Sequence, residues 1–278
     1  MLVRVPKTIK LYINGAFPRT ESGRSFGVNA SDGALYANLC DATRKDLRAC
    51  VDAARAAFEG WAHRSAYNRG QILYRMAEMA SSRTLEIEEC LREVMGLSET
   101  AARAEALAAV DAFVYFAGFT DKYQQLIGSV NPVSGPHHNF TTAEPVGVVG
   151  FLPDAGMSYS GFVAHLAAIL SSGNSVIAVM PGKLGPMLAP LAEVLATSDL
   201  PNGVVNLLTE SKNELFKQLA THMEIQSLCV GDPALFAEAR KLGIENMKRV
   251  AAPRKEPNQL AAILDFVEYK TVWHPIGV

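Results

Sequence analysis

Cysteine is the residue type in this sequence that could supply a nucleophile or a soft metal ligand. The chain has four cysteines, none of them in a C-x-x-C pair, and no histidine cluster stands near them at metal-ligand spacing. Cys229 falls at the end of a predicted buried strand, where cysteine usually serves as a small core hydrophobe. Cys40, Cys50 and Cys90 lie in or near predicted N-terminal helices and have the same interpretation. We therefore expect no catalytic cysteine and no metal site.

Histidine is the other residue type that could do acid–base or metal chemistry. His137 and His138 are adjacent, and adjacent side chains of an extended strand point to opposite faces, so the two rings do not converge on one ion. His165 lies near the middle of a predicted helix and is interpreted as structural. The remaining histidines have no visible chemical partners: His63, His222 and His274.

The clearest local signal is a helix start at residues 231–236, which read Gly-Asp-Pro-Ala-Leu-Phe. Asp232 stands before Pro233, an order typical of an N-cap carboxylate followed by proline in the first helical turn. Such a cap contributes about 1 kcal/mol to stability. The sequence therefore predicts that a helix begins here with a negative charge at its N-terminus.

The elements that position these residues begin with a mostly helical portion, residues 1–127. Lys10–Gly15 alternates and ends in Asn-Gly, which predicts a hairpin, and a second short strand is expected from Ser25 to Val28. A helix is expected after Thr43, which starts a capping-box spacing. Apolar periodicity predicts two further long helical stretches, at residues 66–94 and 99–123.

Residues 145–255 alternate short β-branched runs with helical stretches, the pattern of a parallel sheet built from right-handed crossover units. The predicted strands lie near Val146–Val149, Ser175–Val179, Val204–Leu208, Ile225–Val230 and Met247–Val250. Between the two portions, residues 128–144 are polar and extended and predict a projecting arm or hairpin. Residues 256–278 form a C-terminal tail whose structure the sequence leaves open.

The composition excludes several classes of protein. The chain has 278 residues, 49% of them hydrophobic, with a formal net charge of −2. No basic run indicates a nucleic-acid partner, and no apolar stretch reaches the ~18 residues of a membrane span. The first ten residues are too short and interrupted for a signal peptide. Together with unpaired cysteines, these features predict a cytoplasmic protein.

Four stretches, taken in order, resemble aldehyde dehydrogenases. They are Tyr-Ile-Asn-Gly at 12–15, Ala-Ala-Phe-Glu-Gly-Trp at 56–61, Glu-Pro-Val-Gly-Val-Val-Gly at 144–150, and the run from Ser-Gly-Asn-Ser-Val at 172–176 to Leu-Pro-Asn-Gly-Val-Val-Asn at 200–206. The resemblance covers about residues 8 to 255. It implies an α/β fold in which a Rossmann-like parallel sheet carries an N-terminal helical portion and a projecting β arm, and in which the family's catalytic domain is absent.

The resemblance also implies where catalytic groups should stand. The family attacks its aldehyde with a thiolate, stabilises the oxyanion with an asparagine amide, and activates water with a glutamate. Ala155 takes the place of the asparagine, and losing one such donor typically costs roughly 10²–10³ in rate. The glutamate motif is replaced around Glu256, which reads as part of a solvated loop, and the chain ends at Val278 before the expected cysteine.

The cofactor site that the resemblance implies is equally altered. Val179 or Met180 replaces the lysine that holds the adenosine ribose, although Lys183 could reach back. Gly231 and Asp232 stand where the family has Gly-Ser before the helix that receives the pyrophosphate. Like charges ~4 Å apart repel by ~1–4 kcal/mol in partly wet surroundings, a loss of about 5- to 1000-fold in affinity. We predict weak or absent binding of NAD or NADP.

Three hypotheses follow. The preferred one is an aldehyde dehydrogenase-like pseudoenzyme, a scaffold or regulatory subunit that associates with itself or with an active aldehyde dehydrogenase through the arm, like the second, non-catalytic half of the two-part aldehyde dehydrogenases. The second is a truncated part of a working NAD(P)-dependent aldehyde dehydrogenase. The third is a regulatory module that binds NAD(H); Lys183 and Arg254 are the cations that could support such binding.

Overall fold

The computed structural model describes residues 6–277. Its centre is a five-stranded sheet with the order β10-β9-β6-β7-β8, in which every neighbouring pair is parallel. Each strand overlaps one of the five predicted ones, with ends that differ by up to three residues. Their bounds are β6 Val148–Leu152, β7 Ser175–Met180, β8 Val205–Thr209, β9 Ser227–Val230 and β10 Arg249–Ala251.

Successive side chains along a strand point to opposite faces of the sheet. On each face they form an apolar cluster, and helices cover both clusters. Val149 and Phe151 of β6 join the cluster under α6 and α7, whereas Val148 and Leu152 join the cluster under α1, α8 and α9. The bounds are α1 Arg44–Ala62, α6 Tyr159–Ser171, α7 Leu188–Ala196, α8 Phe216–Thr221 and α9 Pro233–Leu242, with a 3-10 helix η1 at Gly182–Met187.

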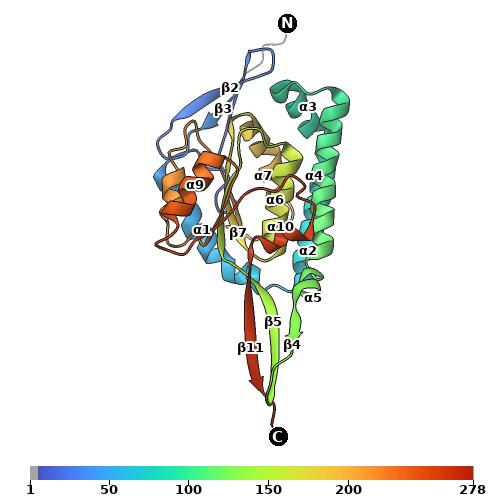
Figure 1. The fold of residues 1–278 in the computed structure, drawn as a ribbon. Coiled ribbons are helices and arrows are strands. Elements are labelled where there is room, and N and C mark those ends of the chain that lie inside the picture. Colours follow the sequence, from blue (N-terminus) through green and yellow to red (C-terminus); the bar gives the residue numbers. More distant parts are fainter. Residues whose placement is uncertain (1–5, 278) are drawn as a thin grey trace.

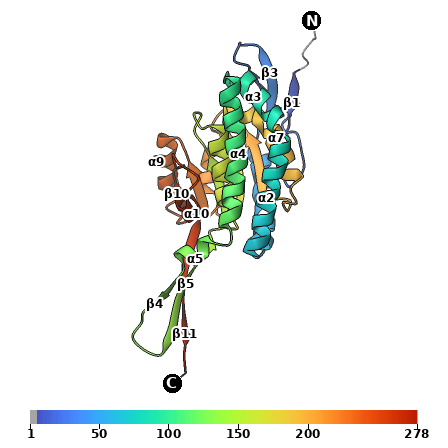
Figure 2. The same ribbon diagram turned by 90° about the vertical axis from the view of Figure 1, so that its right-hand side faces the viewer.

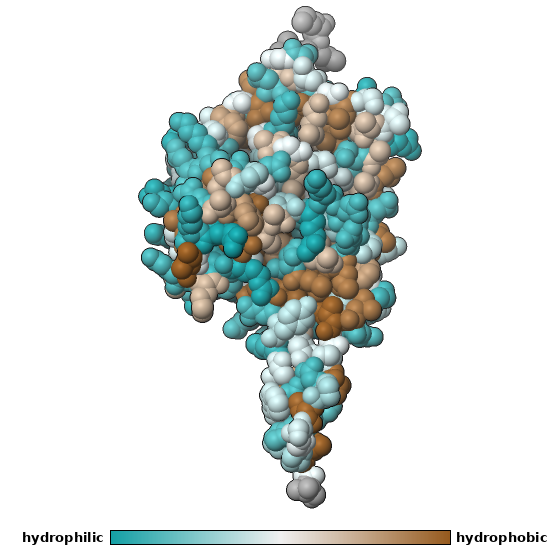
Figure 3. All heavy atoms as spheres, viewed as in Figure 1, coloured by the Kyte–Doolittle hydropathy of each residue, from teal (hydrophilic) through white to brown (hydrophobic). Residues whose placement is uncertain are grey.

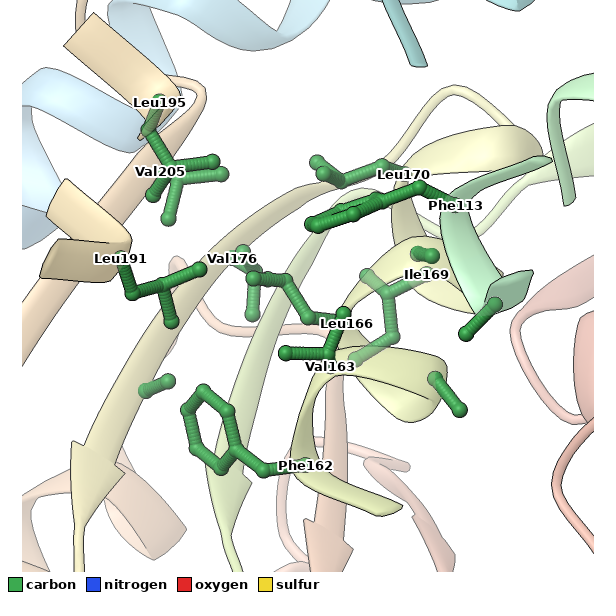
Figure 4. Close-up of a cluster of buried hydrophobic side chains, with 14 of the residues drawn as sticks. Phe113, Phe162, Val163, Leu166, Ile169, Leu170, Val176, Leu191, Leu195 and Val205 are labelled. Atoms are coloured by element: carbon green, nitrogen blue, oxygen red, sulfur yellow. The ribbon is translucent and has the colours of Figure 1, made fainter. Parts of the chain in front are cut away.

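A second layer of helices packs on α6. Figure 2 shows α2 and α4 side by side as an outer layer, with the sheet domain behind them, and both contact α6. In the core between these layers, Phe113 of α4 faces α6, and Phe162 of α6 faces the strands (Figure 4). The outer helices are α2 Ala66–Ser82, α3 Thr84–Met95, α4 Glu99–Phe119 and α5 Tyr123–Ile127.

The prediction of a single helical stretch over residues 66–94 is wrong. The structure has two helices there, α2 and α3, with a break at Arg83. Hydroxyl groups at the break bond to backbone carbonyls of the preceding turn: Ser82 Oγ donates to Met79 O at 2.7 Å and Thr84 Oγ1 donates to Ser81 O at 2.8 Å. Side-chain bonds of this kind compete with helix continuation.

The N-terminal strands also differ from the expected hairpin. The Asn14–Gly15 turn is present, with both residues at positive φ, but it joins a single bridge between Ile13 and Ala16. The strands form a separate sheet with the order β1-β3-β2, and its central strand β3 was not predicted. The bounds are β1 Lys7–Ile9, β2 Ser25–Asn29 and β3 Leu35–Cys40. The expected capping box of α1 is confirmed at Thr43 and Asp46.

The arm projects from one end of the molecule (Figure 1). It is an antiparallel sheet with the order β11-β5-β4, formed by β4 Ser129–Asn131, β5 His137–Pro145 and β11 Val267–Pro275. The C-terminal tail, which the sequence left open, therefore returns to the arm and pairs with β5 along nine residues. A short helix, α10 Leu260–Leu264, precedes β11 and packs on α6.

Candidate functional site

The carboxyl edge of the parallel sheet is the place where α/β folds of this order bind ligands, in the crevice at which the strand order reverses. Here the reversal lies between β6 and β9. The loops after these strands approach closely, since a Cβ atom added to Gly231 would lie 2.4 Å from the backbone nitrogen of Asp154. Glycine at 231 is therefore required by packing between the two loops.

The N-terminus of α9 is capped as the sequence predicts. The Asp232 carboxylate accepts hydrogen bonds from Ala234 N at 2.8 Å and from Leu235 N at 2.9 Å. These two N–H groups are among those that a bound phosphate would use at a helix N-terminus. In this chain their hydrogen bonds go to a carboxylate of the protein itself.

The N-terminus of α6, at the same edge of the sheet, carries a second carboxylate. Ser158 accepts from Gly161 N at 3.1 Å, and Glu105 of α4 accepts from Ser160 N at 2.9 Å. Sequence reasoning missed Glu105, and no local signal marks it, because the contact joins two helices that are distant in the sequence. Both helix N-termini beside the reversal point are thus neutralised by acidic side chains of the chain.

Neither candidate cation has a side-chain hydrogen bond to the first turn of α6 or α9 among the described contacts. Lys183 is exposed in η1 after β7, and β6 separates β7 from β9, a distance of roughly two strand spacings or 10 Å. Arg254 is held by Asp265 in a bidentate ion pair, with Nε–Oδ2 and Nη2–Oδ1 distances of 2.7 Å each. Arg254 therefore already has a carboxylate partner.

Ala155 and Glu256, which the resemblance sets in place of the family's catalytic groups, lie at the surface. Ala155 is exposed in the turn after β6. Glu256 is exposed in the loop after β10, where it accepts a hydrogen bond from Gln259 Nε2 at 2.8 Å. Glu256 makes this local contact within its own loop, as the solvated-loop interpretation predicts.

All four cysteines are buried and none is in a disulfide. Burial raises the pKa of the Cys229 thiol and, with the nearby charge of Asp46, that of Cys50. Burial also raises the pKa of Cys90 to about 12. A thiol with a raised pKa is protonated at neutral pH, and the thiolate is the nucleophilic form. These geometries favour the core role that the sequence suggests.

His165 makes a structural bridge. Its Nδ1 lies 2.7 Å from Gly161 O, and its Nε2 accepts from Arg254 N at 2.9 Å, so the proton of the neutral ring is assigned to Nδ1. Burial lowers the pKa of this imidazole. Both ring nitrogens are engaged by backbone groups, which ties α6 to the loop after β10.

Glu210, directly after β8 at the same edge of the sheet, was also missed. Its Oε2 accepts from Leu215 N at 3.0 Å. Burial raises the pKa of Glu210 to about 7, and the neighbouring charges of Asp41 and Glu214 add to the rise. This hydrogen bond holds the loop between β8 and α8. The only signal in the sequence is that Glu210 directly follows a buried strand.

Two features are absent from the part of the chain that the structure describes. No group of three or more histidine, cysteine, aspartate or glutamate side chains is arranged to hold a metal ion there. Across residues 6–277, no helix has the length and apolarity needed to cross a membrane.

The chain matches a known protein family over most of its length. Residues 19–252 match the aldehyde dehydrogenase family. The chain is 31% identical over 241 residues to the cytosolic 10-formyltetrahydrofolate dehydrogenase of Xenopus tropicalis. The aligned region covers 82% of this chain and 26% of that protein. It is 29% identical over 266 residues to the mitochondrial 10-formyltetrahydrofolate dehydrogenase of Mus musculus, covering 90% and 28% respectively.

Solved structures give the same result for the fold. The NAD⁺ complex of an aldehyde dehydrogenase from Bacillus cereus superposes with a TM-score of 0.81 at 26% identity, covering 88% of this chain and 50% of that one. The chain thus spans about a quarter of the length of these curated relatives and half of this solved structure.

Proposed function

Because the chain belongs to the aldehyde dehydrogenase family, we propose that it acts as a non-catalytic member of it. In this role it is a cytoplasmic scaffold or regulatory subunit that associates, through its arm, with itself or with an active aldehyde dehydrogenase. The family's chemistry needs a reactive thiol, an oxyanion donor and a base. The four cysteines are buried, the resemblance sets Ala155 in the donor's place, and Glu256 lies in an exposed loop.

The observation that carries this proposal is the pair of carboxylates at the carboxyl edge of the sheet. Asp232 and Glu105 each accept hydrogen bonds from the first turn of a helix that could otherwise bind a phosphate. A dinucleotide pyrophosphate would meet negative charge at both places. Electrostatic repulsion lowers the affinity of the dinucleotide for the chain by about 5- to 1000-fold for each carboxylate that the pyrophosphate approaches within ~4 Å.

The arm supports association as the remaining function. Val130, Phe140 and Val272 stand in one row across its three strands, because Phe140 is in register with both valines. Val130 is 70% exposed and Val272 is 41% exposed, and Figure 3 shows hydrophobic residues on the arm among hydrophilic ones. β11 is also an edge strand of the arm sheet, and a free edge can pair with a strand of another chain.

Calorimetric titration of NAD⁺, NADH and NADP⁺ into the whole chain tests the loss of cofactor binding, with an active family member as positive control. We expect no heat of binding up to millimolar cofactor. Micromolar binding would contradict the proposal and favour a module that senses NAD(H).

Association is tested by pull-down of an active aldehyde dehydrogenase on the immobilised chain, and by sedimentation of the chain alone. We expect one of the two complexes to form and Val272→Lys to weaken it. The matched control is Leu85→Lys, which changes an 80% exposed leucine of α3, remote from the arm. A monomeric chain that captures no family member, or equal effects of the two variants, would remove the support for the arm.

The second candidate function is a part of a working NAD(P)-dependent dehydrogenase, and the observation that favours it is the half-length match to solved relatives. On that view, the rest of the protein supplies the cysteine and the cofactor still binds. Ala155 and Asp232 disfavour it because both lie inside the matched region. The calorimetric titration separates the two candidates.

A further inference from the structure

The arm brings together two histidines that stand far apart in the sequence. His138 of β5 and His274 of β11 are directly opposite each other in the antiparallel register. Directly opposite residues on neighbouring strands have Cβ atoms roughly 4.5–5.5 Å apart and share one face of the sheet. Both residues are exposed. The pairing therefore places two exposed histidines opposite each other on one face of the arm.

Ring contacts agree with the opposite faces that His137 and His138 occupy. The His138 ring lies 5.5 Å from the ring of Phe140, two residues along the same strand. The ring of His137 lies 5.9 Å from that of Trp273, on the opposite face. The adjacent histidines thus diverge, as the sequence predicts, and the partner of His138 comes from the C-terminal strand of the arm, β11.

The backbone on both sides of the pair is fixed. Toward the body of the protein, the ladder continues through Val272 and Phe140; toward the tip, Pro275 pairs with His137. Beyond the strand, Ile276 N donates to Pro136 O at 2.9 Å. The two histidines are therefore held in register from both directions, so little conformational freedom is lost when their rings bind a common ligand.

Charges on this face do not oppose a cation. The next row inward is apolar, and the row after it contains Lys270, which is paired with Glu144. Four residues of strand, roughly 13 Å, separate Lys270 from His274. Between Lys270 and His274 on this face stand Val272 and, opposite it, Phe140, and neither is charged.

We propose that His138 and His274 form a two-histidine site for a borderline divalent cation of the Cu²⁺, Ni²⁺ and Zn²⁺ class. Imidazole nitrogen suits these ions, and each ring supplies one ligand. Because no third side chain from the described residues joins the pair, water completes the coordination shell. Affinity follows the order Cu²⁺ above Ni²⁺ and Zn²⁺. The bound ion links β11 to β5 near the arm tip.

The sequence offers a direct readout of this site. The chain has two tryptophans; Trp273 is adjacent to His274 and 59% exposed, and Trp61 is fully buried. Paramagnetic Cu²⁺ bound to the pair quenches the fluorescence of Trp273. Titration of the whole chain with Cu²⁺, followed by fluorescence and calorimetry, is the experiment. We expect one ion to bind per chain.

Variants decide the assignment. We expect His138→Asn and His274→Asn each to weaken Cu²⁺ binding by at least about tenfold, since even the loss of outer-shell partners of metal ligands costs 10–100-fold. His137→Asn, the matched control on the opposite face, retains wild-type affinity. Trp273→Phe removes the quenching but keeps the calorimetric signal. Wild-type affinity in both pair variants, or an equal loss in the control, would overturn the proposal. Circular dichroism confirms that each variant is folded.

Discussion

The Glu105 carboxylate accepts a hydrogen bond from the backbone N–H of Ser160 at 2.9 Å, joining the outer helix α4 to the start of the inner helix α6. Ser160 is the second residue of α6. A helix start carries a partial positive charge and unpaired N–H groups, so the carboxylate is stabilised there as a bound anion would be. The chain thus fills an anion-binding position with its own side chain.

Glu105→Ala tests the energy of this contact. We expect the free energy of unfolding to fall by about 1 kcal/mol, because α6 loses an acceptor and a favourable charge at its first turn. Urea denaturation measures the change. The control is Asp111→Ala, an exposed acidic residue of the same helix, which should change stability by less than about 0.5 kcal/mol. Equal losses in the two variants would show that Glu105 does not act through α6.

Asp232 combines two roles that substitution separates. Asp232→Ala removes the acceptor of two hydrogen bonds and should lower stability by about 1 kcal/mol. Asp232→Ser keeps a capping oxygen but removes the charge, so most stability should remain while affinity for NAD⁺ rises by about 5- to 1000-fold. Thermal unfolding and calorimetry measure the two effects. A serine variant no better than wild type at binding NAD⁺ would show that the charge of Asp232 is not what limits affinity.

Gly231→Ala tests the contact between the two loops at the reversal point. The new Cβ would lie 2.4 Å from Asp154 N, so one loop must shift, at a cost of about 1–3 kcal/mol. Gly60 in α1 is the matched control, since a Cβ there meets nothing within 4 Å. Gly60→Ala should stabilise the protein by about 0.5–1 kcal/mol through helix propensity. Urea denaturation of both variants checks these opposite signs.

Glu210 predicts a pH dependence of stability. Its pKa is raised from 4.5 to about 7 in the folded protein, mainly by burial. Between these values the folded state binds more protons than the unfolded state, so this residue's contribution to stability is present below pH 4.5 and is lost as pH rises through 7. The full shift corresponds to ~3 kcal/mol, and partial solvent exposure reduces this to about 1–2 kcal/mol.

The Glu210→Gln variant isolates this contribution. Relative to wild type, we expect it to gain stability as pH increases from 4.5 to 8, because glutamine has no charge to bury. Denaturation curves at pH 4.5, 6, 7 and 8 measure the difference between the two proteins. A difference that is constant across this range would show that Glu210 does not titrate with a raised pKa.

Local patterning was enough to place the five strands of the parallel sheet. Strands β6, β7, β8 and β9 are short, mostly apolar runs in which every residue is buried, and such runs are distinctive when helices separate them. The edge strand β10 is exposed or half-buried. The N-cap at Asp232 and the capping box at Thr43 were equally visible, because capping depends on residues within one turn of the chain.

Contacts between distant segments could not be read in this way. β3 has little apolar alternation, and it is a strand because β1 and β2 pair with both of its edges. β11 was left open because its sequence is mostly exposed and becomes a strand only through β5. The position of Glu105 depends on how α4 packs on α6, and no short motif specifies that packing.

The sequence by itself determined the α/β class, the five parallel strands and the helix cap at Asp232, since periodicity and local residue identity carry these properties. Only the tertiary structure decided that the C-terminal strand belongs to the arm, that Glu105 caps α6 and that His138 stands opposite His274. Each of these depends on the register or packing of segments separated by many residues. Pairing energy of that kind is set by the whole fold rather than by local propensity.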